Sequence, residues 1–236
     1  MTQQQDYKYK YELHAHTAEC DLCASMSGGE MVKVYHDLGY SGIVITDHYF
    51  SLFFEWFAAE LSGASHAEII RRWLRGYESA RNEGERLGFT VLAGAEVRFD
   101  GEINDYLIYG VEPEFFYSAP LLNRLGSVER LCEVLPEGGL VVQAHPFRDG
   151  MTVRDPSHLF GIEGYNGGTA PFRNQMATTF AAHYGKPTTS GSDVHHLPGA
   201  GKGGIVTNTP ILTPQDLTRV LTSGAYGLME DGEVKA

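Results

Sequence analysis

Strand-like and helix-like segments alternate along the whole chain, and this alternation is the feature that most constrains the fold. Strands are expected where short apolar runs end in polar residues, over 11–16, 42–48, 89–96, 105–111, 139–145, 162–165 and 188–193. Helices are expected where apolar residues recur at helical spacing, over about 30–39, 67–87, 121–135, 172–184 and 214–222. Because no repeat or Pro/Ser-rich linker separates these segments, we predict a single α/β domain over residues 1–236.

Composition narrows the class of protein further. Hydrophobic residues make up 42% of the chain and the formal net charge is -12, which is typical of a globular protein but disfavours a nucleic-acid-binding surface. The polar start and the lack of a long apolar run predict neither a signal peptide nor a membrane span. Three cysteines are too few for a disulfide framework. We therefore expect a cytoplasmic protein without membrane contact.

Histidines and acids gather where the predicted strands end. In chain order they are His14, His16, Asp47, His48, Glu96, His145, Glu163, Asp193 and His195. The C-terminal ends of parallel barrel strands converge on one rim, so these side chains are expected to meet. Alternate positions on a strand face the same side, and His14 and His16 can therefore bind one ion. Imidazole and carboxylate together suit zinc, manganese or iron, and there are more ligands here than one ion needs.

Five motifs at these strand ends carry a family resemblance. They are Leu13-His-Ala-His-Thr17, Ile45-Thr-Asp-His48, Gly94-Ala-Glu96, Ala144-His-Pro146 and Gly191-Ser-Asp-Val-His195. In this order, over about residues 11–208, they resemble the successive motifs of the polymerase and histidinol phosphatase (PHP) superfamily of metal-dependent phosphoesterases. The resemblance implies a distorted, TIM-like (β/α)7 barrel. It also implies two or three divalent ions, of zinc, manganese or iron, at the C-terminal ends of the strands.

The resemblance implies a set of ligands as well. A first ion would be held by His14, His16, Glu96 and Asp193. Glu96 would bridge to a second ion, held also by His145. A third ion would be bound by His48 and His195.

Two positions depart from the commonest family pattern. Asp105 stands at the start of the fourth strand, where many relatives have a histidine; a carboxylate can serve there but raises the local negative charge. Asp21 falls where the loop after the first motif usually supplies a ligand to the third ion, and Glu19 and Cys23 lie close to it. We include Asp21 and Asp105 among the candidate metal ligands.

The expected activity is hydrolysis of a small phosphomonoester, such as a histidinol-phosphate-like compound, a nucleotide or a sugar phosphate. Two ions about 3.5–4 Å apart would activate a bridging solvent oxygen as a hydroxide nucleophile. The candidate catalytic residues are His14, His16, Glu96, His145, Asp193 and His195. Arg98 and Arg148 are placed to bind the phosphate, although each can equally pair with a nearby acid. Three divalent ions against four carboxylates leave a local charge of roughly +2, which suits an anionic substrate.

Two further features are interpreted from their position. Glu163 is expected to orient a metal ligand instead of binding the ion itself. The aromatic run from Tyr49 to Phe57 follows the Asp47-His48 motif directly, and Trp56 is a candidate to stack on a ring of the substrate. Cys20 and Cys23 are interpreted as small packing thiols, with Cys23 a weaker candidate for a ligand.

Other functions stay open at this level. A metal-dependent amidohydrolase also begins with His-x-His, but that plan needs a bridging lysine or acid in mid-barrel, and no lysine follows a predicted strand. A nuclease-type phosphodiesterase acting on the ends of short oligonucleotides is a second alternative. A non-enzymatic domain that stores metal, regulates, or serves a polymerase is a third. The sequence does not specify the oligomeric state.

Overall fold

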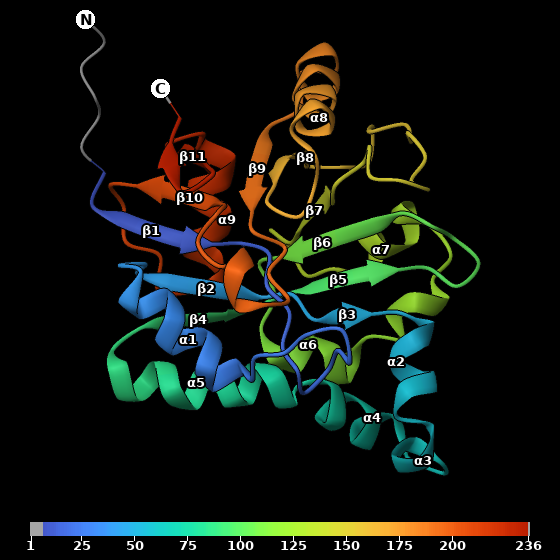
Figure 1. The fold of residues 1–236 in the computed structure, drawn as a ribbon. Coiled ribbons are helices and arrows are strands. Elements are labelled where there is room, and N and C mark those ends of the chain that lie inside the picture. The colour runs from blue at the N-terminus through green and yellow to red at the C-terminus, as the bar shows by residue number, and fades with distance from the viewer. Residues whose placement is uncertain (1–6, 236) are drawn as a thin grey trace, which may run out of the picture.

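The computed structural model describes residues 7–235, which form two six-stranded sheets with helices packed around them (Figure 1). The first sheet contains, in spatial order, β12 (Glu233–Val234), β11 (Gly227–Glu230), β10 (Gly204–Thr207), β1 (Tyr9–Glu12), β2 (Gly42–Ile45) and β4 (Thr90–Ala93). The second contains β3 (His48–Tyr49), β5 (Ala95–Arg98), β6 (Asp105–Tyr109), β7 (Leu140–Gln143), β8 (Gly161–Asn166) and β9 (Thr188–Gly191).

Helices connect most of these strands. They are α1 (Gly28–Asp37), α2 (Ser51–Trp56), α3 (Ala58–Leu61), α4 (His66–Trp73), α5 (Arg75–Leu87), α6 (Pro113–Ser118), α7 (Val128–Val134), α8 (Pro171–His183) and α9 (Pro214–Ser223), with short 3-10 turns η1 (Leu122–Arg124) and η2 (Leu197–Gly199). Capping boxes at Ser27, Ser65 and Thr213 begin α1, α4 and α9, since each side chain satisfies backbone donors of the first turn. Over residues 7–235 we find no helix with the length and apolar character needed to cross a bilayer.

The strand pairing confirms the mixed α/β class but does not confirm a closed seven-stranded barrel. The pairs β2–β4, β7–β8 and β8–β9 are parallel, whereas β1–β10, β5–β6 and β6–β7 are antiparallel. The two sheets meet where Ala15 forms a parallel bridge with Val194 and accepts a hydrogen bond from the backbone of Thr46. This junction lies between His14 and His16, so the region where the sheets meet also carries the first motif.

Several predicted elements are divided in the structure. The helix expected over 67–87 is two helices, α4 and α5, that meet at Leu74, where ψ opens to 0° and both Trp73 and Leu74 are buried. The strand expected over 89–96 is divided at Gly94 into β4 of the first sheet and β5 of the second, and a side chain at Gly94 would come within 2.8 Å of a methyl group of Val44. The helix expected over 121–135 is interrupted by Gly126 at φ +78°, which separates η1 from α7.

One hydrophobic core packs against the second sheet and is rich in aromatic side chains. Trp73 packs on Tyr49 and Phe116, with ring centroids 4.9 and 4.7 Å away, and all three side chains are buried. The indole N–H of Trp73 donates to the backbone oxygen of His48 over 3.0 Å. The core therefore fixes the start of β3, where the second histidine-bearing motif lies.

Candidate metal centre

The predicted ligands converge on one buried cluster, although they come from loops and strand ends far apart in the sequence. The side chains of His14, His16, Asp21, Glu96 and His145 are each 1% exposed or less. Asp105 is equally buried and Asp193 nearly so, and His48 and His195 lie at the more accessible edge. Three groups are defined here by their residues. They are the His14 site (His14, His16, Glu96, Asp193), the His145 site (Glu96, Asp105, His145) and the Asp21 site (His16, Asp21, His48, His195).

The His14 site has the spacing of ligands around one cation. The Nε2 atom of His14 lies 3.4 Å from Glu96 Oε1 and 3.6 Å from Asp193 Oδ1. The Nε2 atom of His16 lies 3.5 Å from Glu96 Oε2 and 3.3 Å from the same Asp193 oxygen. Tetrahedral ligands with bonds of about 2.0–2.1 Å to zinc stand about 3.3 Å apart. These gaps are long for hydrogen bonds but match ligands that share an ion.

The other two sites adjoin it. In the His145 site, His145 Nε2 is 2.8 Å from Glu96 Oε1 and 3.8 Å from Asp105 Oδ2. In the Asp21 site, Asp21 Oδ2 is 2.6 Å from His48 Nδ1 and 3.1 Å from His195 Nε2. Glu96 also contacts His48 Nε2 at 2.9 Å, so its carboxylate touches all three sites.

Buried polar atoms without hydrogen bonds mark the cluster as a cation site. Among residues 7–235, no hydrogen-bond partner with acceptable geometry faces His14 Nε2, His16 Nε2, Asp21 Oδ2, His48 Nδ1 or Asp193 Oδ1. Leaving a buried polar group unsatisfied costs about 1–3 kcal/mol. A divalent cation bound by these lone pairs would remove that cost, and the residues therefore fit the metal ions that the sequence predicts.

The ionisation states of His16 and Asp193 suit metal ligation. Burial, together with His48 and His195, lowers the pKa of His16 to about 3, so this imidazole is neutral and its lone pair is available. Burial opposes ionisation of Asp193, but His14, His16 and His145 outweigh it and hold the pKa of that carboxyl well below its usual range. Two of the residues also have strained backbones, since φ is +26° at His145 and +50° at Asp193. Strain of this kind is common at functional sites.

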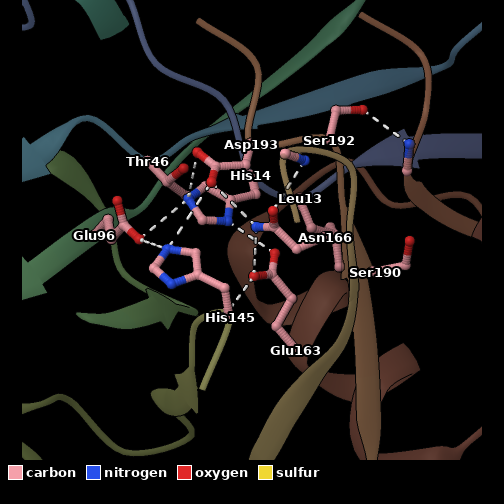
Figure 2. Close-up of polar contacts among 12 residues, drawn as sticks. Leu13, His14, Thr46, Glu96, His145, Glu163, Asn166, Ser190, Ser192 and Asp193 are labelled. Atoms are coloured by element: carbon pink, nitrogen blue, oxygen red, sulfur yellow. Dashed lines mark hydrogen bonds and ion pairs between the residues drawn. The ribbon is translucent and has the colours of Figure 1, made fainter. Parts of the chain in front are cut away.

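Glu163 orients two of the ligands, as predicted. Its Oε1 atom lies 2.8 Å from His14 Nδ1, so Glu163 holds a proton on Nδ1 while Nε2 is directed at the cluster. Its Oε2 atom accepts from the backbone N–H of His145 over 3.0 Å and from the Asn166 amide over 2.9 Å. Figure 2 shows the Glu163 carboxylate between His14 and His145.

Asp47 has a supporting position outside the three sites. Its carboxylate accepts hydrogen bonds from the backbone N–H and the hydroxyl of Thr17, over 2.6 and 2.8 Å. Burial raises the pKa of Asp47 to about 7. Its contacts hold the segment after His16 against β2.

Glu12 is a structural residue that the sequence analysis missed. Its buried carboxylate accepts from the backbone N–H groups of Leu13, His14 and Ser192 over 2.8–3.0 Å, and from the hydroxyl of Tyr35 over 2.7 Å. These contacts join the first motif to the last one. An acid between Tyr11 and Leu13, which are apolar positions of the predicted strand, was the available signal.

Arg98 and Arg148, the two arginines expected to bind phosphate, differ in how they contact nearby acids. Arg98 forms a bidentate pair with Asp105, with Nε–Oδ1 and Nη2–Oδ2 distances of 2.6 and 2.7 Å. Arg98 thus has the acid partner that was the alternative interpretation, and its binding of phosphate stays a prediction. Arg148 contacts Asp193 Oδ2 by Nη1 alone, over 3.1 Å, and its side chain is 38% exposed.

The side chains of Glu19 and Cys23, the alternatives to Asp21 as a metal ligand, are not among the clustered ligands of the described residues. Glu19 accepts hydrogen bonds from the backbone N–H of Gly28, at the start of α1. Cys23 is exposed, and its backbone N–H donates to Asp21 Oδ1 over 2.7 Å. Cys20 is buried with its Sγ against the backbone oxygen of Trp73, which agrees with a packing thiol.

Comparisons with known proteins agree with this arrangement. Residues 171–226 match the family model for the PHP-associated domain. The fold resembles a two-domain protein from Bacteroides vulgatus that contains a predicted PHP-like metal-dependent phosphoesterase. That match has a TM-score of 0.66 and 14% identity, and it covers 99% of this chain and 71% of that one. The family-model match is confined to residues 171–226, and the structural match at 14% identity shows a shared fold.

Two further solved structures extend the comparison. A proposed metal-dependent phosphoesterase from Bifidobacterium adolescentis matches with a TM-score of 0.53 and 17% identity, over 92% of this chain and 97% of that one. An amidohydrolase from Chromobacterium violaceum matches with a TM-score of 0.51 and 16% identity, over 79% of this chain and 87% of that one. No curated protein sequence matches the chain. The neighbours thus share a fold that hosts both phosphoesterases and amidohydrolases.

Proposed function

We propose that this protein is a metal-dependent phosphatase that hydrolyses a small phosphomonoester. The observation that carries the proposal is the set of buried imidazole and carboxylate atoms that lack hydrogen bonds and stand at ligand spacing around Glu96. Two or three divalent ions would be held by the His14, His145 and Asp21 sites. When bound, such ions supply the positive charge that stabilises phosphoryl oxygens and activates water.

The protein's own residues would position the substrate. Arg148 is anchored to the centre by one nitrogen on Asp193 and is partly exposed, so the rest of its guanidinium is available to a phosphate at the edge of the cluster. The ring of Phe50 lies 4.4 Å from that of His48, and Trp56 stands 5.9 Å beyond Phe50. This aromatic side favours substrates that carry a ring next to the phosphate.

The ligand chemistry favours a phosphoesterase over an amidohydrolase. The shared ligand of the cluster is the carboxylate of Glu96, and across residues 7–235 the groups of clustered metal-binding side chains include Asp21 and His48. The amidohydrolase plan does not call for a histidine after the second strand or a glutamate after the third. Hydrolysis of oligonucleotide ends stays an alternative outcome, because the same ions would serve a diester.

The test is phosphate release by the metal-loaded protein. The protein is freed of metal with a chelator, reloaded with manganese or zinc, and offered phosphomonoesters, a phosphodiester and N-acyl amides. We expect metal-dependent release from at least one monoester, with a loss of about 100-fold or more in Glu96→Gln and none in the surface control Glu129→Gln. Absence of release from every monoester, or preferential hydrolysis of the amides, would refute the proposal.

A further inference from the structure

Asp105 is the ligand whose charge departs from the family pattern, and it is also the ligand held by an arginine. Arg98 meets both oxygens of this carboxylate, over 2.6 and 2.7 Å. Asp105 is 1% exposed, so bulk water does not compete for these oxygens. A bidentate guanidinium pair is stronger and more directional than a single charged hydrogen bond.

The pairing of Arg98 with Asp105 follows from the register of two neighbouring strands. Strands β5 and β6 are antiparallel, and their register places Arg98 directly opposite Asp105. The guanidinium of Arg98 also lies 5.1 Å from the centroid of the Phe50 ring, which steadies it by a cation–π contact. Because its strand already fixes the position of Asp105, the carboxylate does not need Arg98 in order to reach the cluster.

The pair changes the charge of the His145 site. Glu96 is shared with the other two sites and an imidazole ligand is neutral, so Asp105 is the only carboxylate that belongs to the His145 site alone. Arg98 cancels this negative charge. A guanidinium next to a divalent cation is also repulsive, and burial weakens the screening of that repulsion.

The neighbouring sites have no equivalent pair. In the described part of the chain, the ionisable side chains paired with Asp21 are the imidazoles of His48 and His195, and no guanidinium contacts it. Asp193 meets Arg148 through one nitrogen at 3.1 Å, and that arginine is 38% exposed, so its charge is better screened. The three sites are therefore unequal in the charge they offer to a cation.

We propose that Arg98 neutralises Asp105 and thereby makes the His145 site the weakest of the three, so that its ion dissociates first and exchanges with the solution. The inference rests on the metal centre of the proposed function.

An opposite role for Arg98 makes an opposite prediction. If Arg98 chiefly orients Asp105, its removal should weaken the ion at the His145 site, as loss of a supporting partner usually does by 10–100-fold. If its charge is what matters, removal should strengthen binding there. The sign of the change therefore decides between the two roles.

The experiment counts zinc ions per chain after dialysis against increasing chelator concentrations. In the wild type we expect one ion to leave before the others. In Arg98→Met that ion should leave only at a chelator concentration about tenfold higher or more. Arg98→Lys, which keeps the charge but not the fork, should behave like the wild type. Asp105→Asn should lose this early-leaving ion at the lowest chelator concentration, and Arg154→Met serves as a surface control.

Several results would overturn the inference. One is that the early-leaving ion binds Arg98→Met as tightly as the wild type, or less tightly. A second is that Arg98→Lys behaves like Arg98→Met. A third is that all ions leave the wild type at the same chelator concentration. Circular dichroism establishes that each variant is folded before ions are counted. Phosphate release is a separate readout, so a protein that loses its ions in two stages but cleaves no phosphoester would reject the proposed function and leave the inference standing.

Discussion

Replacing Glu163 with glutamine tests how the centre is oriented, because the change preserves shape and removes one charge. The carboxylate accepts hydrogen bonds at both oxygens, from His14 Nδ1 and from the backbone of His145 and the amide of Asn166. An amide has one oxygen and one NH2 group. If the NH2 group faces His145 and Asn166, it meets the N–H donors of these residues. If it faces His14, it forces the imidazole into the tautomer that protonates Nε2.

The expected magnitude follows from these contacts. If the amide nitrogen faces His14, the Nε2 atom that lies 3.4 Å from Glu96 Oε1 carries a proton and cannot bind an ion. Loss of such an orienting partner lowers metal affinity by about 10–100-fold, or about 1.4–2.7 kcal/mol. Loss of a buried hydrogen bond to a charged group also lowers the free energy of unfolding of the metal-free protein, by about 1.5–3 kcal/mol.

The assay is a competition titration of zinc between the protein and a chromogenic chelator, with Glu129→Gln as the matched surface control. Urea unfolding of the metal-free proteins gives the change in stability independently. The reasoning would be refuted if folded Glu163→Gln bound zinc as tightly as the wild type and the control.

Three other predictions follow from the same geometry. Although burial disfavours the charged form, Asp21 and Glu96 raise the pKa of His48 to about 10 in the metal-free protein, so metal binding must displace its proton. Affinity should then rise with pH between 6 and 9 with proton release, measurable by calorimetry in buffers of different ionisation enthalpy; a flat profile would contradict this. In Gly191→Ala a Cβ would overlap that of His14 and lie 2.8 Å from Glu163 Oε1, so the free energy of unfolding should fall by about 1–3 kcal/mol and the zinc count should drop; unchanged melting would count against the packing argument. Trp56→Ala should raise KM for ring-bearing phosphomonoesters while the metal count by elemental analysis stays constant; an unchanged KM would remove Trp56 from the substrate site.

Most of the candidate ligands could be predicted because they follow directly on the end of a strand, whereas Asp21 lies in a loop and Asp105 at the start of β6. An apolar run that stops at a histidine or an acid fixes both the local direction of the chain and the position of the side chain, as with His14 after β1 and His145 after β7. Because the strand ends converge, these side chains come close together in space. The structure brings His14, His16, Asp21, His48, Glu96, Asp105, His145, Asp193 and His195 together, whereas Asp47 lies outside the three sites.

The features of the fold and the site that could not be predicted depend on contacts between distant segments of the chain. The pairing of Arg98 with Asp105 follows from the antiparallel register of β5 and β6, which a local pattern does not fix. The support given by Glu12 needs Tyr35 and Ser192, which come from α1 and from the chain after β9. The antiparallel strand β10 was missed as well, because a four-residue run so close to the glycines 203 and 204 gives a weak strand signal. These are tertiary constraints, and a single sequence carries little record of them.

Anomalous diffraction from crystals grown with zinc tests the central claim most directly. We expect strong peaks inside the cluster, one of them about 2.0–2.2 Å from the Nε2 atoms of His14 and His16 and from carboxylate oxygens of Glu96 and Asp193. Crystals that take up zinc only at surface residues, with these four side chains left without an ion, would contradict the account.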